Sequence, residues 1–114
     1  MTASSPSLFH VALAADWQQA LVAGEYRVST RGRSLAEEGF LHMSYAAQWP
    51  GVLDAYYRDL AEPLVLLEVD PDRVRSPVVV EPPPGAPEGA EAYPHVYGPL
   101  PVEAVVAVHP DPRQ

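Results

Sequence analysis

The chain has 114 residues, with 15 acidic side chains against seven basic ones, 14 prolines and no cysteine. This length fits one domain, and 47% hydrophobic residues suffice for a buried core. Without cysteine there is no disulfide, no thiolate metal ligand and no cysteine nucleophile. All seven basic residues are arginines, which excludes Schiff-base lysine chemistry and a P-loop lysine. A net charge of −8 argues against a nucleic-acid partner, because such binding needs clustered positive charge.

The two ends carry no targeting signal. Residues 1–7 are small and polar, with no basic segment or apolar run of a signal peptide. No stretch approaches the roughly 20 apolar residues that span a bilayer. We therefore expect a cytoplasmic protein without a membrane partner. It would have a disordered tail over 1–7, one domain over 8–110 and a frayed C-terminal tail over 111–114.

The first elements predicted are a strand, a helix and a second strand. Residues 8–13 (LFHVAL) form an apolar run with His10 embedded in it, which is typical of a buried strand. A helix is predicted over 17–23, with Asp16 as its N-cap. Residues 26–30 alternate as a strand does.

The middle of the chain predicts two more helices around a short strand. The segment 34–39 (SLAEEG) is a capping box followed by glycine, with room for about one helical turn. A strand with His42 embedded in it is expected over 40–43. Ser44 is the expected N-cap of an amphipathic helix over 45–60.

Strands and a proline-rich loop fill the C-terminal half. The nearly all-apolar segment 64–69 predicts a central strand, and 78–81 predicts another that ends in Glu81. Residues 82–92 are a loop by composition, and 102–108 form the last predicted strand. Several strands with two substantial helices indicate an α+β fold.

Three histidines occupy similar apolar or aromatic settings: His10 in LFHVA, His42 in GFLHMS and His95 in YPHVYG. A buried histidine must satisfy its ring nitrogens, so each one either holds the fold together or faces a cavity. Three such positions in a small domain favour a shared site. No two of them have the spacing of a metal motif, so no metal is expected.

Aromatic side chains and one carboxylate accompany the histidines. Trp17, Tyr26, Tyr93 and Tyr97 could stack on a planar ring of a ligand, or they could fill the core. Glu81 could stabilise a developing oxocarbenium ion, or it could be an ordinary charge at the end of a strand.

Four polar residues complete the predicted ligand-binding set. Arg27, Arg31 and Arg33 could meet a pyrophosphate as bidentate donors. Ser44 lies two residues after His42, but no nucleophile elbow surrounds it, so a serine-hydrolase triad has little support.

The segments EGFLHMS and YPHVYGPL, together with the pattern from Leu8 to Pro110, resemble the DUF952 family of small bacterial proteins. The resemblance implies an ADP-ribosyltransferase-like fold, in which a mixed, split β-sheet and two main helices surround an NAD-sized cleft. It also implies that His10 holds the ribose and nicotinamide side of NAD. GFLHMS is similar to the second-strand histidine segment of RNA 2′-phosphotransferases, and Glu81 or His95 would face the same cleft.

The resulting functional expectation is a histidine-lined cleft for NAD or another nucleotide-like small ligand. If the protein is an enzyme, NAD is its substrate and an N-glycosidic bond is cleaved or transferred, with His10, His42, Glu81 and His95 as catalytic residues. An RNA substrate is disfavoured by the acidic excess. Two alternatives stay open: a non-catalytic ligand-binding or interaction protein, and a biosynthetic enzyme that uses His42 or His95 in acid–base catalysis on an apolar metabolite. The oligomeric state is not indicated.

Overall fold

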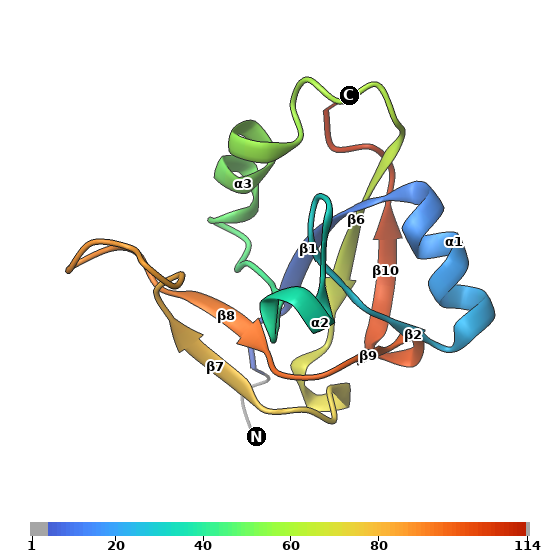
Figure 1. The fold of residues 1–114 in the computed structure, drawn as a ribbon. Helices are drawn as coiled ribbons and strands as arrows, with labels where there is room; N and C mark the ends of the chain where they lie inside the picture. Colours follow the sequence, from blue (N-terminus) through green and yellow to red (C-terminus); the bar gives the residue numbers. More distant parts are fainter. Residues whose placement is uncertain (1–4, 114) are drawn as a thin grey trace.

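The computed structural model describes residues 5–113, in which small antiparallel sheets pack with three helices (Figure 1). The helices are α1 (Ala14–Ala23), α2 (Leu35–Glu38) and α3 (Trp49–Tyr56), with short 3₁₀ turns at Pro71–Arg73 and Val102–Ala104. The strands are β1 (Leu8–Leu13), β2 (Glu25–Tyr26), β3 (Val28–Thr30), β4 (Arg33–Ser34), β5 (Leu41–His42), β6 (Leu64–Val69), β7 (Val78–Glu81), β8 (Tyr93–Val96), β9 (Leu100–Pro101) and β10 (Val105–His109).

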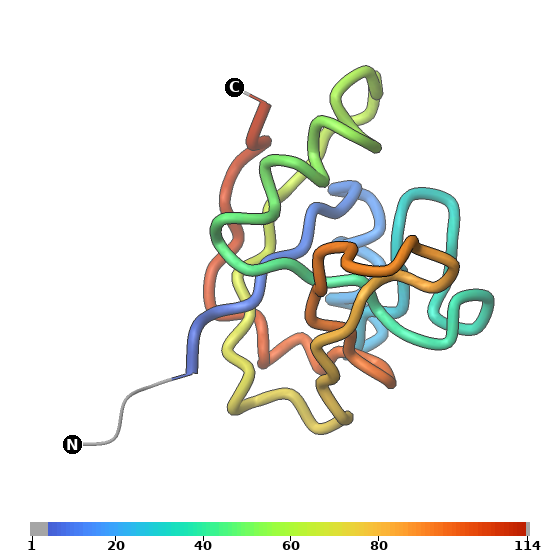
Figure 2. Tube along the Cα trace, turned by 90° about the vertical axis from the view of Figure 1, so that its left-hand side faces the viewer, coloured from blue at the N-terminus to red at the C-terminus, as the bar shows by residue number. Residues whose placement is uncertain are grey.

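The central sheet has the order β1-β6-β10, and both neighbours run antiparallel to β6. The β6 strand is apolar at nearly every position because side chains on both of its faces are covered. Helix α1 packs against this sheet and buries Trp17 and Ala20 in the main core (Figure 1). Since β1 and β10 run in the same direction, residues 5–7 and the segment after β10 lie at opposite ends of the sheet (Figure 2).

A second sheet, with the order β5-β8-β7, lies beside the first. Leu41 and Val96 form a cross-strand pair and are fully buried in the main core. The next pair along, His42 and His95, therefore lies on the opposite face of this sheet. The two sheets are joined by a bridge between Phe9 and Ser44, whose backbone groups exchange hydrogen bonds of 2.7 and 2.8 Å.

Two short strand pairs complete the fold: β2 with β9, and the hairpin β3–β4. Helix α2 follows β4 directly and begins with the capping box of Ser34 and Glu37, as the sequence predicts. It ends at Gly39, whose φ of 88° favours glycine.

Helix α3 covers a second, smaller core, where Val52 and Leu53 pack with Leu64 and Leu66. The C-terminal segment is fastened beside this helix. Arg113 donates hydrogen bonds to the carbonyl groups of residues 57, 60 and 62. These hydrogen bonds connect the C-terminal segment to the residues that follow α3.

The strands over 8–13, 64–69 and 78–81 are confirmed with the predicted bounds. The loop over 82–92 and the two substantial helices are also observed. The expected mixed sheet is wrong for the described residues, because every strand pair among them is antiparallel.

Several predicted boundaries are also wrong. Helix α1 begins at Ala14 with Leu13 as its N-cap, so Asp16 lies inside the first turn. Ser44 is not an N-cap, since its backbone pairs with β1, and α3 begins only at Trp49. The strand expected over 26–30 is divided into β2 and β3, and the one over 102–108 begins as a 3₁₀ turn.

Of the predicted N-terminal tail, residues 1–4 lie outside the described part of the chain, as does residue 114. Within residues 5–113, no helix is both long and apolar enough to cross a membrane.

Candidate functional site

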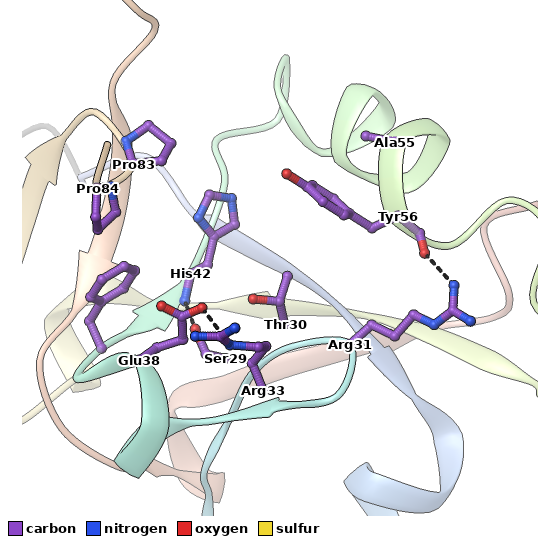
Figure 3. Close-up of a pocket in the computed structure, with 11 residues that line it drawn as sticks. Ser29, Thr30, Arg31, Arg33, Glu38, His42, Ala55, Tyr56, Pro83 and Pro84 are labelled. Carbon is purple, nitrogen blue, oxygen red and sulfur yellow. Dashed lines mark hydrogen bonds and ion pairs between the residues drawn. The ribbon is translucent and has the colours of Figure 1, made fainter. Parts of the chain in front are cut away.

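A cleft of about 660 Å³ lies between the β3–β4 hairpin, strand β5, the end of α3 and the start of the proline loop. His42 stands between the proline pair on one side and Tyr56 on the other (Figure 3). The lining residues are Ser29, Thr30, Arg31, Arg33, Glu38, Phe40, His42, Ala55, Tyr56, Pro83 and Pro84.

One wall of the cleft is the outer face of the second sheet, where alternate residues carry rings. The ring centroids of Phe40 and His95 are 4.0 Å apart in a stacked arrangement. Those of His42 lie 5.3 Å from His95 and 4.9 Å from Tyr93, and Tyr97 lies 5.5 Å from Phe40. Five rings thus form a continuous row, and Phe40 and His42 present it to the cleft.

His42 is the histidine that reaches the cleft. Its ring is half-buried and makes no hydrogen bond to any other residue within 5–113. Burial, and secondarily the neighbouring rings of His10 and His95, lowers the pKa of His42 to about 4. The ring is therefore neutral at pH 7, with one nitrogen that donates and one that accepts.

His10 is fully engaged within the protein. Its Nδ1 lies 2.7 Å from the carbonyl oxygen of His42, to which it must donate a proton. Its Nε2 lies 3.1 Å from the Tyr26 hydroxyl and so accepts from it. Burial lowers the pKa of His10 to about 4, so the ring is neutral. With both nitrogens occupied, this geometry gives His10 the role of joining β1 to β5.

His95 is completely buried and belongs to a hydrogen-bonded group with Glu81 and Tyr97. Its Nδ1 lies 2.8 Å from the Glu81 carboxylate, which also accepts a hydrogen bond from the Tyr97 hydroxyl. These two bonds, that of Tyr97 first, lower the pKa of Glu81 and keep it ionised. Glu81 thus faces His95 rather than the cleft.

Two of the three predicted arginines line the cleft. Arg33 pairs with Glu38 at 3.0 Å, and Arg31 donates to the carbonyl of Tyr56 (Figure 3). Arg31 also lies 3.9 Å from Asp59. Arg27 lies elsewhere, beside a separate hollow next to α1, and pairs with Glu25.

The other predicted ligand-binding residues lie apart from the cleft lining. Trp17 and Tyr26 are buried in the main core, and Ser44 is buried at the junction of the two sheets. Tyr93 is half-buried against His42, and Tyr97 is exposed beside Glu81.

Phe40, Glu38 and Tyr56 were not predicted from the sequence, and neither were the small and proline residues of the lining. The sequence spacing could have indicated Phe40, because it stands two residues before His42 and so shares its face of the strand. The sequence could also have indicated that Tyr56 is not a core residue. Adjacent helical residues point in different directions, so Tyr56 and Tyr57 cannot both face the core.

The described residues contain no cluster of potential metal ligands. Between residues 5 and 113, no group of three or more histidine, aspartate or glutamate side chains is arranged to hold an ion.

Comparison with known proteins gives the chain its family. The family model described as "Protein of unknown function (DUF952)" matches residues 11–108. The chain belongs to the DUF952 family. This match runs from within β1 to within β10 and includes His42 and His95, whereas His10 lies one residue before it. The expectation from EGFLHMS and YPHVYGPL is thereby confirmed at the level of the family.

Solved structures of a similar protein support this architecture. A crystal structure of CC0527 from Caulobacter crescentus is 25% identical, with a TM-score of 0.74 over 91% of this chain and 84% of that one. A crystal structure of a CC0527 double mutant aligns with a TM-score of 0.73, and the solution NMR structure of CC0527 with 0.64, each at 25% identity. These alignments cover 91% of this DUF952 chain and 84% and 83% of those chains. No curated protein matches the chain.

Proposed function

We propose that the cleft of this DUF952 protein binds a planar, anionic small ligand of nucleotide type. The observation that carries the proposal is the neutral ring of His42. It stands with Phe40 in a ring-lined wall, while Arg31 and Arg33 line the same cleft. A nucleotide offers the three complementary parts: a flat base, sugar hydroxyls and an anionic phosphate.

The size and lining of the cleft suit such a ligand. Small-molecule sites typically enclose about 300–1,000 Å³ and combine apolar walls with a few polar groups. This cleft has about 660 Å³, with Phe40, Tyr56 and two prolines beside the polar side chains. An aromatic face can stack on a nucleobase without selecting a particular base.

Arg31 is the better placed of the two arginines for a phosphate. Its ion pair with Asp59 is long, at 3.9 Å, and the Asp59 side chain is 90% exposed. Such a pair is weak in water, so an incoming phosphate can replace it at little cost. Arg33 is held by Glu38 at 3.0 Å, which keeps its charge balanced until a ligand enters.

The protonation state of His42 favours binding over proton transfer. With a pKa of about 4, the ring seldom carries a second proton at pH 7. A general base works best when its pKa lies near the working pH. His42 therefore acts as a neutral hydrogen-bonding group, and acid–base catalysis on an apolar metabolite has less support.

A second candidate function is cleavage or transfer at the N-glycosidic bond of NAD. It is favoured by Glu38, whose carboxylate lines the cleft and could stabilise positive charge on the ribose. Glu81 is less suited to that task, because it faces His95 and does not line the cleft. Release of nicotinamide from NAD, abolished by Glu38→Gln, would be the expected signature of this reaction.

Titration calorimetry with NAD and with AMP tests the proposed binding. We expect saturable binding by the wild type, and at least a tenfold loss of affinity in Arg31→Ala and in His42→Gln. Arg75→Ala and His109→Gln are matched controls, because these residues pair with Glu103 and Glu68 away from the cleft, and they should bind normally. Absence of binding at millimolar ligand, or equal affinity in all four variants, would contradict the proposal.

A further inference from the structure

His95 has a buried nitrogen that needs a partner. Its side chain is 0% exposed, and Nε2 has no hydrogen-bond partner among the described residues. A buried polar atom left unpaired costs about 1–3 kcal/mol, so such atoms are rare and call for an explanation.

Glu81 determines which hydrogen-bonding role this nitrogen has. The carboxylate accepts a hydrogen bond from Nδ1 of His95 at 2.8 Å, so Nδ1 carries the proton. In the neutral ring Nε2 is then an acceptor. A proton on Nε2 would only create a buried donor without an acceptor. The missing partner of His95 must therefore be a hydrogen-bond donor.

His42 is the neighbour that can provide this donor. The two histidines form a cross-strand pair between β5 and β8, with ring centroids 5.3 Å apart on the same face of the sheet. The neutral ring of His42 has one N–H group, and no described residue accepts a hydrogen bond from it. Rotation about the terminal side-chain torsion of histidine is soft, so a small turn of the ring can direct that N–H to Nε2.

We propose that Glu81 and His95 are positioning residues that act through His42. One nitrogen of His42 donates to Nε2 of His95, which fixes the tautomer of His42 and leaves its other nitrogen as an acceptor for the ligand. The ionised Glu81 thus determines which ring nitrogen of His42 donates and which accepts, although Glu81 itself does not line the cleft.

The consequence for the ligand rests on the proposed function. In this cleft the free ring nitrogen of His42 accepts a hydrogen bond. A ligand that fits must therefore place an O–H or N–H donor at that position. In a nucleotide, the ribose hydroxyls are the donors near the phosphate. AMP should therefore bind at least tenfold more tightly than its 2′,3′-dideoxy analogue.

The tautomers can be measured without any ligand. Two-bond ¹H–¹⁵N correlation spectra distinguish protonated from unprotonated ring nitrogens. We expect His95 as its Nδ1–H tautomer, and His42 in a single tautomer. In Glu81→Gln the amide can donate as well as accept, so the ring nitrogens of His42 should move toward the averaged shifts of a tautomer mixture. His95→Gln should produce the same change at His42. Glu68→Gln is the matched control, because Glu68 accepts from His109 at 2.9 Å on the other sheet, and it should leave His42 unchanged.

Each outcome decides one of the two proposals. An unchanged tautomer of His42 in a folded Glu81→Gln variant would overturn the positioning role, whether or not a nucleotide binds. Failure of AMP to bind, with the tautomer change observed, would contradict the proposed function and support the positioning role. Equal affinity for AMP and its dideoxy analogue would overturn the assignment of an acceptor at His42.

Discussion

At the scale of single residues, three histidines in similar sequence settings have three different roles. His10 has both nitrogens bonded within the protein, His42 has a ring in the cleft, and His95 has one nitrogen bonded and one unpartnered. The sequence predicts strands around His10 and His42, and both are confirmed; the strand that carries His95 was not predicted. It could not predict the roles, because the deciding partners, Tyr26 and Glu81, are distant in sequence and meet the histidines only in the folded chain.

The buried state of His10 predicts how stability depends on pH. Its pKa is about 4 in the folded protein against an ordinary 6.5, so the unfolded chain binds more protons between these values. The free energy of unfolding should therefore fall as the pH is lowered from 6.5 to 4, by about 3 kcal/mol from His10 alone. His42 contributes in the same direction.

Urea denaturation between pH 7 and pH 4 measures this effect. His10→Asn keeps an amide donor for the His42 carbonyl but cannot titrate, so its unfolding free energy should depend less steeply on pH. The carboxylates titrate in both proteins, so the difference between the two slopes reports the titration of His10. Identical slopes for His10→Asn and the wild type would show that His10 is not buried as a neutral ring.

At the scale of elements, the second sheet carries the site because its residues alternate. Strands β5 and β8 send Leu41 and Val96 into the core, and their neighbours His42 and His95 to the opposite face. The alternation of side chains along these strands could be predicted from the sequence, and so could strands β1 and β6. The start of α3 was not, because Ser44 is drawn into backbone pairing with Phe9, a contact 35 residues away that local capping propensity cannot indicate.

The turn between β8 and β9 depends on Gly98. A Cβ atom added there would lie 2.7 Å from Cβ of Ser76 and in closer conflict with its Oγ, whereas the backbone of Gly98 itself suits an alanine. We expect Gly98→Ala to lower the free energy of unfolding by about 1–3 kcal/mol through overpacking.

A double-mutant cycle tests the cause. Ser76→Gly removes both conflicting atoms, so the double variant Gly98→Ala/Ser76→Gly should regain most of the stability lost in Gly98→Ala. Gly51→Ala is the control, because nothing lies within 4 Å of an added Cβ in α3, and it should not destabilise. Additive effects in the cycle would mean that Ser76 is not the obstacle.

At the scale of the whole molecule, the cleft is assembled from segments that are far apart in sequence. The β3–β4 hairpin, strand β5, the end of α3 and the proline loop each contribute a part of the lining. This explains why Pro83 and Pro84 were not predicted as lining residues: a surface made of four segments has no local sequence pattern. The net charge of the chain is −8, so the two arginines of the cleft are a local positive charge that attracts an anion.

The most direct test of the central claim is a titration with NAD followed by ¹H–¹⁵N correlation spectra of the backbone amides. We predict saturable shifts confined to the cleft, in residues 29–33, 38–42 and 55–56. No shifts at millimolar NAD would contradict the account, as would shifts centred instead on the separate hollow lined by Trp49 and His109.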